Sequence, residues 1–203
     1  MSIADLTEHS TAIHESAHFY AGWKFKHDVE SLTIVPSSDG ALGVYSKRPG
    51  PDMELDDETD ASRVRNENNI IELLAGPAAE YYFLGKPVWE TLPGDLTPAV
   101  RYACLRHFDG TEADVVAYVR YLWVVTQSFV SDSLNWHSIT SLAGDLLALK
   151  TISAEGAVAR LEAAAQRFKA EHPSRQQPVC RIMESNAFDP VVARVLRELG
   201  AIP

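Results

Sequence analysis

The sequence predicts a mainly α protein (α+β) in which a small β-hairpin or sheet lies beside the first helix. Three observations support this fold class. Residues 5–26 are rich in helix formers, and neither proline nor glycine interrupts them before Gly22. Helical hydrophobic spacing recurs through most of residues 61–171. Only residues 31–35 and 41–46 show patterns typical of strands.

The two strand-like segments predict a short hairpin. Residues 31–35 alternate apolar and polar side chains and end at Pro36, which cannot donate a hydrogen bond to a sheet. A turn follows, and residues 41–46 form the second expected strand. Gly43 within it indicates a bulge or a close approach of another group to the main chain.

The rest of the chain is expected to be helical. A long helix is predicted at residues 61–84, kinked or broken at Gly76-Pro77 because proline removes one helical hydrogen bond. A loop over residues 88–94 leads to Asp95, which is placed like an N-terminal residue of the next helix. Further helices are expected at 98–107, 112–134, 136–149, 154–171 and 190–199.

Length and composition suit one main domain. The chain has 203 residues, 46% of them hydrophobic, which is enough for one substantial core but not for two. We expect residues 1–170 to form this domain. Residues 171–203 are expected to form a C-terminal linker and helix packed on the same domain.

Charge and cysteine content restrict location and partners. The net charge of −10 argues against a nucleic-acid partner, which usually requires a basic face. The longest apolar run, near residues 121–125, is far shorter than the roughly 20 residues of a membrane span. The first residues lack the pattern of a secretory signal, and Cys104 and Cys180 have no paired spacing. We therefore expect a cytoplasmic protein.

The motif His-Glu-x-x-His occupies residues 14–18 of the first helix. Residues four apart lie on one face of a helix, so His14 and His18 can direct two imidazoles at one point, as a zinc ion requires. Glu15 lies one step round the helix, where it can reach a metal-bound water as a general base.

The motif alone leaves a second interpretation open. Short patterns occur by chance, and an amphipathic helix with two surface or structural histidines could contain the same sequence motif. A catalytic zinc site also needs a third protein ligand and an open fourth position. No third histidine follows at the spacing that extended zinc motifs use.

Several motifs in one order resemble the peptidase domain of the FtsH-type AAA+ zinc proteases. The similarity covers about residues 7–165, with a weaker match at 142–147 and Thr151. The segments that carry it are Ala12–His18, Leu32–Pro36, Gly40–Gly43, the Leu-Leu-Ala-Gly-x-Ala-Ala-Glu run at 73–80, and Asp95-Leu96.

The resemblance implies a ligand set and a catalytic base. It implies that His14, His18 and Asp95 bind one zinc ion per chain and that Glu15 is the base. A carboxylate on a second helix can also close a tetrahedron. Glu80 is a competing ligand, although it is better placed to orient a ligand histidine. Without the resemblance, Asp95 would be interpreted as a plain helix cap.

The resemblance also implies an activity, a zinc metalloendopeptidase acting on peptides or unfolded protein segments. A substrate would lie extended along an edge strand, here Ala41, Leu42, Gly43 and Val44, although these residues could equally serve only hairpin packing. The ATPase module and membrane helices of the family have no counterpart in this sequence, so we expect no ATP-driven unfolding by this chain. A separate ATPase or a homo-oligomer is a possible partner.

The sequence departs from the family pattern at two places, and the second of them, the loop before Asp95, supports a rival interpretation. The family has Gly-Arg at the position of Gly76-Pro77, and its loop before the aspartate differs from residues 90–94 here. The rival is a catalytically inactive, zinc-stabilised adaptor or binding module. An intact Glu15 argues against this rival, because a structural zinc site needs no base.

Overall fold

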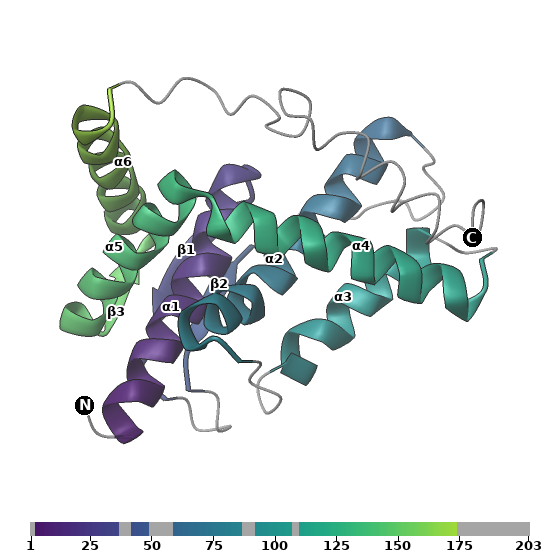
Figure 1. Ribbon diagram of the computed structural model, residues 1–203, viewed down its shortest axis with the longest axis horizontal. Helices are drawn as coiled ribbons and strands as arrows, with labels where there is room; N and C mark the ends of the chain where they lie inside the picture. The colour runs from purple at the N-terminus through teal and green to yellow at the C-terminus, as the bar shows by residue number, and fades with distance from the viewer. Residues whose placement is uncertain (1–2, 37–41, 49–58, 87–91, 107–109, 174–203) are drawn as a thin grey trace, which may run out of the picture. The chain divides into compact units, whose positions relative to one another are not determined.

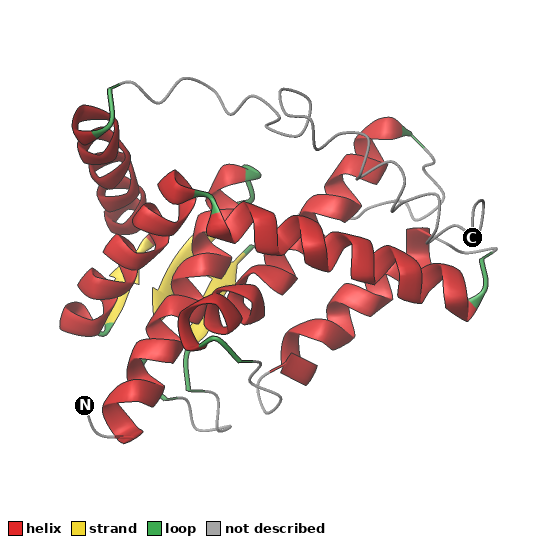
Figure 2. Cartoon of the chain, viewed as in Figure 1, coloured by secondary structure: helices red, strands yellow, loops and turns green. Residues whose placement is uncertain are grey.

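The computed structural model describes residues 3–36, 42–48, 59–86, 92–106 and 110–173 (Figure 1). Within these ranges the protein is mainly helical with one small antiparallel sheet, which confirms the predicted fold class (Figure 2). The described helices are α1 (Ile3–Lys24), α2 (Asp60–Leu84), α3 (Leu92–Arg106), α4 (Glu112–Ser131), α5 (Ser133–Leu149) and α6 (Ala154–Glu171).

Helix α1 is enclosed by other elements along its second half. It packs against α2, α5 and the sheet, and every residue from Ala12 to Gly22 is buried. Small residues at Ala12, Ala17 and Ala21 let these neighbours approach closely on several sides. The His-Glu-x-x-His motif therefore lies on a helix that is buried all round rather than on an amphipathic surface helix.

Helix α2 is defined by clear caps at both ends. The Thr59 hydroxyl accepts a hydrogen bond from the main-chain N–H of Ser62, and Gly85 ends the helix with a φ of 69°, which suits glycine. Of the kink or break expected at Gly76-Pro77, the break is wrong, because the helix continues through Pro77. Residues 74–80 are all buried, and this packing offsets the hydrogen bond that proline removes.

The sheet has the strand order β2-β1-β3, with both pairs antiparallel. Leu32 in the central strand faces Tyr45 on one side and Ile152 on the other. Figure 2 shows the three short strands in yellow among the helices. The strands are β1 (Val29–Thr33), β2 (Val44–Lys47) and β3 (Thr151–Ser153).

The strand boundaries differ from the predicted ones. β1 begins two residues before the expected segment 31–35, and β2 begins three residues after the start of 41–46. Leu42 and Gly43 precede β2, and Ala41 lies outside the described residues. Cross-strand pairing decides these limits, and the pairing shifts register between Val29 and Ser31.

Helix boundaries also differ near the predicted loop 88–94. Helix α3 already begins at Leu92, so Asp95 lies within its first turn rather than at its first position. The boundary between α4 and α5 falls at Asp132, whose carboxylate accepts hydrogen bonds from two main-chain N–H groups of the next turn. This cap ends α4 at Ser131, three residues before the expected end.

Two buried clusters form the core. One joins α1, α2, α4, α5, α6 and the sheet, and the other joins α2, α3 and α4. The chain divides into a compact unit of residues 1–168 and a second unit of 169–203. The C-terminal linker and helix expected at 171–203 lie almost entirely outside the described residues. Among the described helices, none is both long and apolar enough to cross a membrane.

Candidate metal centre

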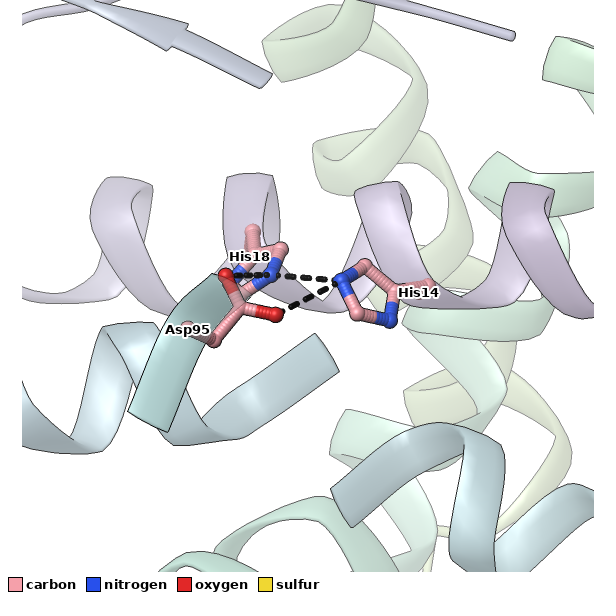
Figure 3. A group of neighbouring side chains, drawn as sticks. All are labelled: His14, His18 and Asp95. Carbon is pink, nitrogen blue, oxygen red and sulfur yellow. Dashed lines mark hydrogen bonds and ion pairs between the residues drawn. The ribbon is translucent and has the colours of Figure 1, made fainter. Parts of the chain in front are cut away.

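His14 and His18 direct their Nε2 atoms at one point, as their spacing on α1 predicts. The two Nε2 atoms lie 2.9 Å apart, and both side chains are buried. Asp95 enters from α3, with Oδ2 3.2 Å from Nε2 of His14 and Oδ1 3.4 Å from Nε2 of His18. Figure 3 shows the two rings and the carboxylate converging from two helices.

This arrangement fits a tetrahedral metal. Zinc binds nitrogen and oxygen ligands at about 2.0–2.1 Å, which places the ligand atoms about 3.3 Å apart. The two Nε2 atoms lie 2.9 Å apart, and each has an oxygen of Asp95 nearby, Oδ2 at 3.2 Å from His14 and Oδ1 at 3.4 Å from His18. With one ligand atom taken from each residue, all three atoms lie within 4.8 Å of one another. Two imidazoles and one carboxylate form a donor set that suits zinc and leave a fourth position for a water or a substrate atom. His14, His18 and Asp95 could therefore hold a metal ion.

Hydrogen bonds behind the rings fix both imidazoles. Nδ1 of His14 donates to Oε2 of Glu80 at 2.9 Å, and the hydroxyl of Ser10 donates to the other oxygen of Glu80 at 2.7 Å. Nδ1 of His18 donates to the main-chain carbonyl of Glu72 at 2.7 Å. A proton on each Nδ1 leaves each Nε2 with its lone pair toward the shared point, as metal binding requires.

Glu80 thus occupies the outer position that the sequence analysis favoured over direct ligation. Its carboxylate contacts the ring nitrogen of His14 that faces away from the shared point. Glu80 is 4% exposed and lies on the buried face of α2. The group that fits a metal is His14, His18 and Asp95 without Glu80.

The electrostatics of the three side chains favour a proton on His14. Burial disfavours protonation of His14, but hydrogen bonds with Asp95 and Glu80 outweigh it and raise its pKa to about 10. Burial would likewise raise the pKa of Asp95, but the neighbouring histidines hold it well below its usual range. The site therefore favours positive charge at the point where the three ligand atoms meet.

Glu15 lies beside the three ligands in the same cavity, which has a volume of about 330 Å³. Burial raises the pKa of Glu15, and the two histidines only partly oppose this effect. The main chain of Gly43 packs directly against it: a Cβ at position 43 would lie 2.8 Å from Oε1 of Glu15. The close approach predicted from this glycine is therefore a contact with the proposed base.

Gly76 is a site residue that the sequence analysis missed. A Cβ on it would lie 2.4 Å from Nε2 of His18 and 2.6 Å from Nε2 of His14, so α2 can cross beneath both rings only with glycine here. The available signal was a glycine on the buried face of a long helix. Glycine destabilises a helix relative to alanine, so its presence there indicates that a neighbouring group packs too closely for a side chain.

The predicted substrate residues have different positions. Gly43 and Val44 line the cavity with Tyr45 and Lys47, whereas Leu42 is 48% exposed and does not line it. Ala41 lies outside the described residues.

Comparison with known proteins does not assign the chain to a family. No family model matches the sequence, and no curated protein matches it significantly.

Proposed function

We propose that this protein is a zinc-dependent metalloendopeptidase. The observation that carries the proposal is the meeting of three ligand atoms, from His14, His18 and Asp95, in one cavity with a buried glutamate. A structural zinc site usually has four protein ligands and no adjacent base. Three ligands with Glu15 beside them instead match the composition of a hydrolytic site.

The three ligands, Glu15 and the groups behind the histidine rings have separate roles in the proposed peptide hydrolysis. A zinc ion held by the three ligands would supply a water of pKa roughly 7 and a positive charge for the carbonyl oxygen. Glu15 accepts a proton from the attacking water and returns it to the leaving amine. Its raised pKa makes its carboxylate a better proton acceptor than an exposed one. Glu80 and the carbonyl of Glu72 keep the histidine rings in place.

Strand β2 is the proposed substrate platform. The strand order places β2 at an edge of the sheet, with β1 on one side. Residues 43–45 and 47 line the cavity that contains the ligands and Glu15. An extended peptide could add to this edge by main-chain hydrogen bonds, which would present its scissile carbonyl to the site. This geometry favours unfolded segments, exposed loops or peptides as substrates, alone or with a separate unfoldase.

The test combines metal content with cleavage of casein, for the wild type and for Glu15→Gln. We expect one zinc per chain in both proteins and cleavage by the wild type only, because glutamine keeps the shape but cannot accept the proton. Thr97→Ser, on the same helix as Asp95 but outside the cavity lining, is a control that should cleave normally. Zinc without cleavage in the wild type would favour the adaptor, and absence of any bound metal would refute both interpretations.

A further inference from the structure

A second buried charge lies close to the metal centre. Glu72 on α2 is 2% exposed, and its carboxylate forms an ion pair with Nζ of Lys47 at 2.7 Å. The same carboxylate accepts a hydrogen bond from Nδ1 of His27, which lies between α1 and β1. Burial would raise the pKa of Glu72, but these two partners lower it, so the group is ionised. We call His27, Lys47 and Glu72 the Glu72 clasp.

The clasp reaches one of the proposed metal ligands through the main chain. The carbonyl oxygen of Glu72 accepts the hydrogen bond from Nδ1 of His18. The side chain of Glu72 therefore holds strand β2 through Lys47, while its main chain holds the ring of His18. One residue of α2 thus contacts both the proposed substrate strand and the proposed metal site.

Tyr45 provides a second contact between the same two parts. It lies two residues before Lys47 in β2, so both side chains point to the same side of the strand. Its ring stacks on that of His18, with centroids 6.1 Å apart and planes inclined by 15°. Lys47 and Tyr45 both line the cavity of the site. A movement of β2 would therefore act on the ring of His18 through the ring of Tyr45.

We propose that Glu72 is a positioning residue that couples the edge strand β2 to the metal ligand His18. The proposal rests on the proposed role of His18 in metal binding. The clasp fixes α2 at Glu72, and this fixes the carbonyl that orients the His18 ring. Outer hydrogen bonds of this kind typically change metal affinity by about 10- to 100-fold. An ion pair with a purely structural role would change the free energy of unfolding and leave His18 unaffected.

The first measurement is zinc affinity by competition with a chromophoric chelator. Lys47→Met removes the cation but keeps most of the side-chain volume, and it should weaken zinc binding by about tenfold or more. Lys47→Arg retains the cation and should restore affinity to within about threefold of the wild type. Arg48→Met is the matched control: it removes the adjacent cation, whose ion pairs with Asp28 and Glu30 are exposed, and should leave affinity unchanged.

The second measurement needs no metal. In protein with ¹⁵N-labelled imidazoles, the Nδ1–H proton of His18 should exchange slowly with water in the wild type and in Arg48→Met. It should exchange at least several-fold faster in Lys47→Met. If the wild type binds no zinc, the proposed metal centre fails, and this exchange rate alone supports or refutes the coupling through Glu72.

Wild-type zinc affinity together with an unchanged His18 signal in Lys47→Met would overturn the proposal. Lys47→Met leaves one buried carboxylate with a single partner, which threatens folding. If that variant does not fold, Lys47→Met combined with Glu72→Gln leaves no buried ion unpaired. The double variant should then show the same loss of affinity and the same fast exchange, and wild-type values in it would refute the coupling.

Discussion

Glu80 holds His14 by the ring nitrogen that faces away from Asp95. Oε2 of Glu80 lies 2.9 Å from Nδ1, while Oδ2 of Asp95 lies 3.2 Å from Nε2 on the opposite side of the ring. The imidazole is thus fixed between a carboxylate of α2 and a carboxylate of α3. One carboxylate sets the orientation and basicity of the ring, and the other shares the point at which a metal would bind.

Glu80→Gln should weaken zinc binding by about 10- to 100-fold while the fold persists. The amide keeps the size of the side chain but lacks the charge that makes His14 a stronger donor. Chelator competition measures the affinity, and circular dichroism checks the fold. Glu8→Gln is the control, since Glu8 lies on α1 in an exposed ion pair with Lys150. Equal affinity in Glu80→Gln and Glu8→Gln would contradict the proposed role of Glu80.

Gly76→Ala should abolish tight zinc binding. Its Cβ would lie 2.4 and 2.6 Å from the two Nε2 atoms, so the rings or α2 must move. Such overpacking costs about 1–3 kcal/mol, and the better helix propensity of alanine returns at most about 1 kcal/mol. Zinc affinity and urea unfolding are the measurements.

Gly144→Ala is the matched control for this substitution. It lies inside α5, where a new Cβ would have no atom within 4 Å. This variant should gain up to about 1 kcal/mol in free energy of unfolding and keep wild-type zinc affinity. If both alanine variants bound zinc like the wild type, the position of Gly76 beneath the rings would be wrong.

The sequence predicted those parts of the site that depend only on residues close together in the chain. The spacing of His14 and His18 specifies a shared helix face, so their convergence follows from helix geometry alone. Asp95 comes from another helix, and only the family resemblance brought it to the site. Gly76 carried a signal, as a glycine within a long helix, but its contact with the two rings depends on where α2 crosses α1. The role of Glu72 depends on the same crossing.

The fold shows the same division between local and long-range information. Long helices have enough periodic positions to be predicted from sequence, as α2 was. Strand β3 has only three residues, Thr151–Ser153, and exists because it pairs with β1. Such a segment carries no period that would distinguish it from a loop. The start of α3 was misplaced for a similar reason, since element boundaries are weakly encoded.

At about pH 6, zinc binding should release about one proton per site from His14, because a zinc-bound water of pKa roughly 7 is still largely protonated there. His14 has a pKa of about 10 in the metal-free protein, so its extra proton must leave before Nε2 can bind a metal. Calorimetric titrations in buffers of different ionisation enthalpy measure this release. A binding enthalpy that does not depend on the buffer would contradict the proton shared by His14 and Asp95.

The same proton should stabilise the metal-free fold. The pKa of His14 rises from 6.5 to about 10 on folding, so its contribution is complete below pH 6.5 and disappears as the pH rises through about 10. In the presence of a chelator, the wild type should lose free energy of unfolding over this range relative to His14→Gln. Urea unfolding at several pH values measures the difference. A difference that stays constant across the range would show that the His14 pKa is not raised by folding.

Gly43→Ala should separate catalysis from metal binding. The new Cβ would lie 2.8 Å from both Cγ and Oε1 of Glu15, so the carboxylate must shift while the three ligands keep their places. A displacement of about 1 Å at a catalytic group can cost about 100-fold in rate. We therefore expect kcat for casein to fall by about this factor, with zinc affinity within twofold of the wild type.

The control for this variant is Leu42→Ala. Leu42 precedes Gly43, is 48% exposed and does not line the cavity, so its loss should leave both kcat and zinc affinity unchanged. Thr11 must be considered as well, because the same Cβ would lie 2.9 Å from its Cγ2. Adding Thr11→Ser removes that methyl group and relieves only this second contact. If the double variant recovered full activity, crowding of Thr11 rather than displacement of Glu15 would explain the loss, and Glu15 would no longer be tied to catalysis through Gly43.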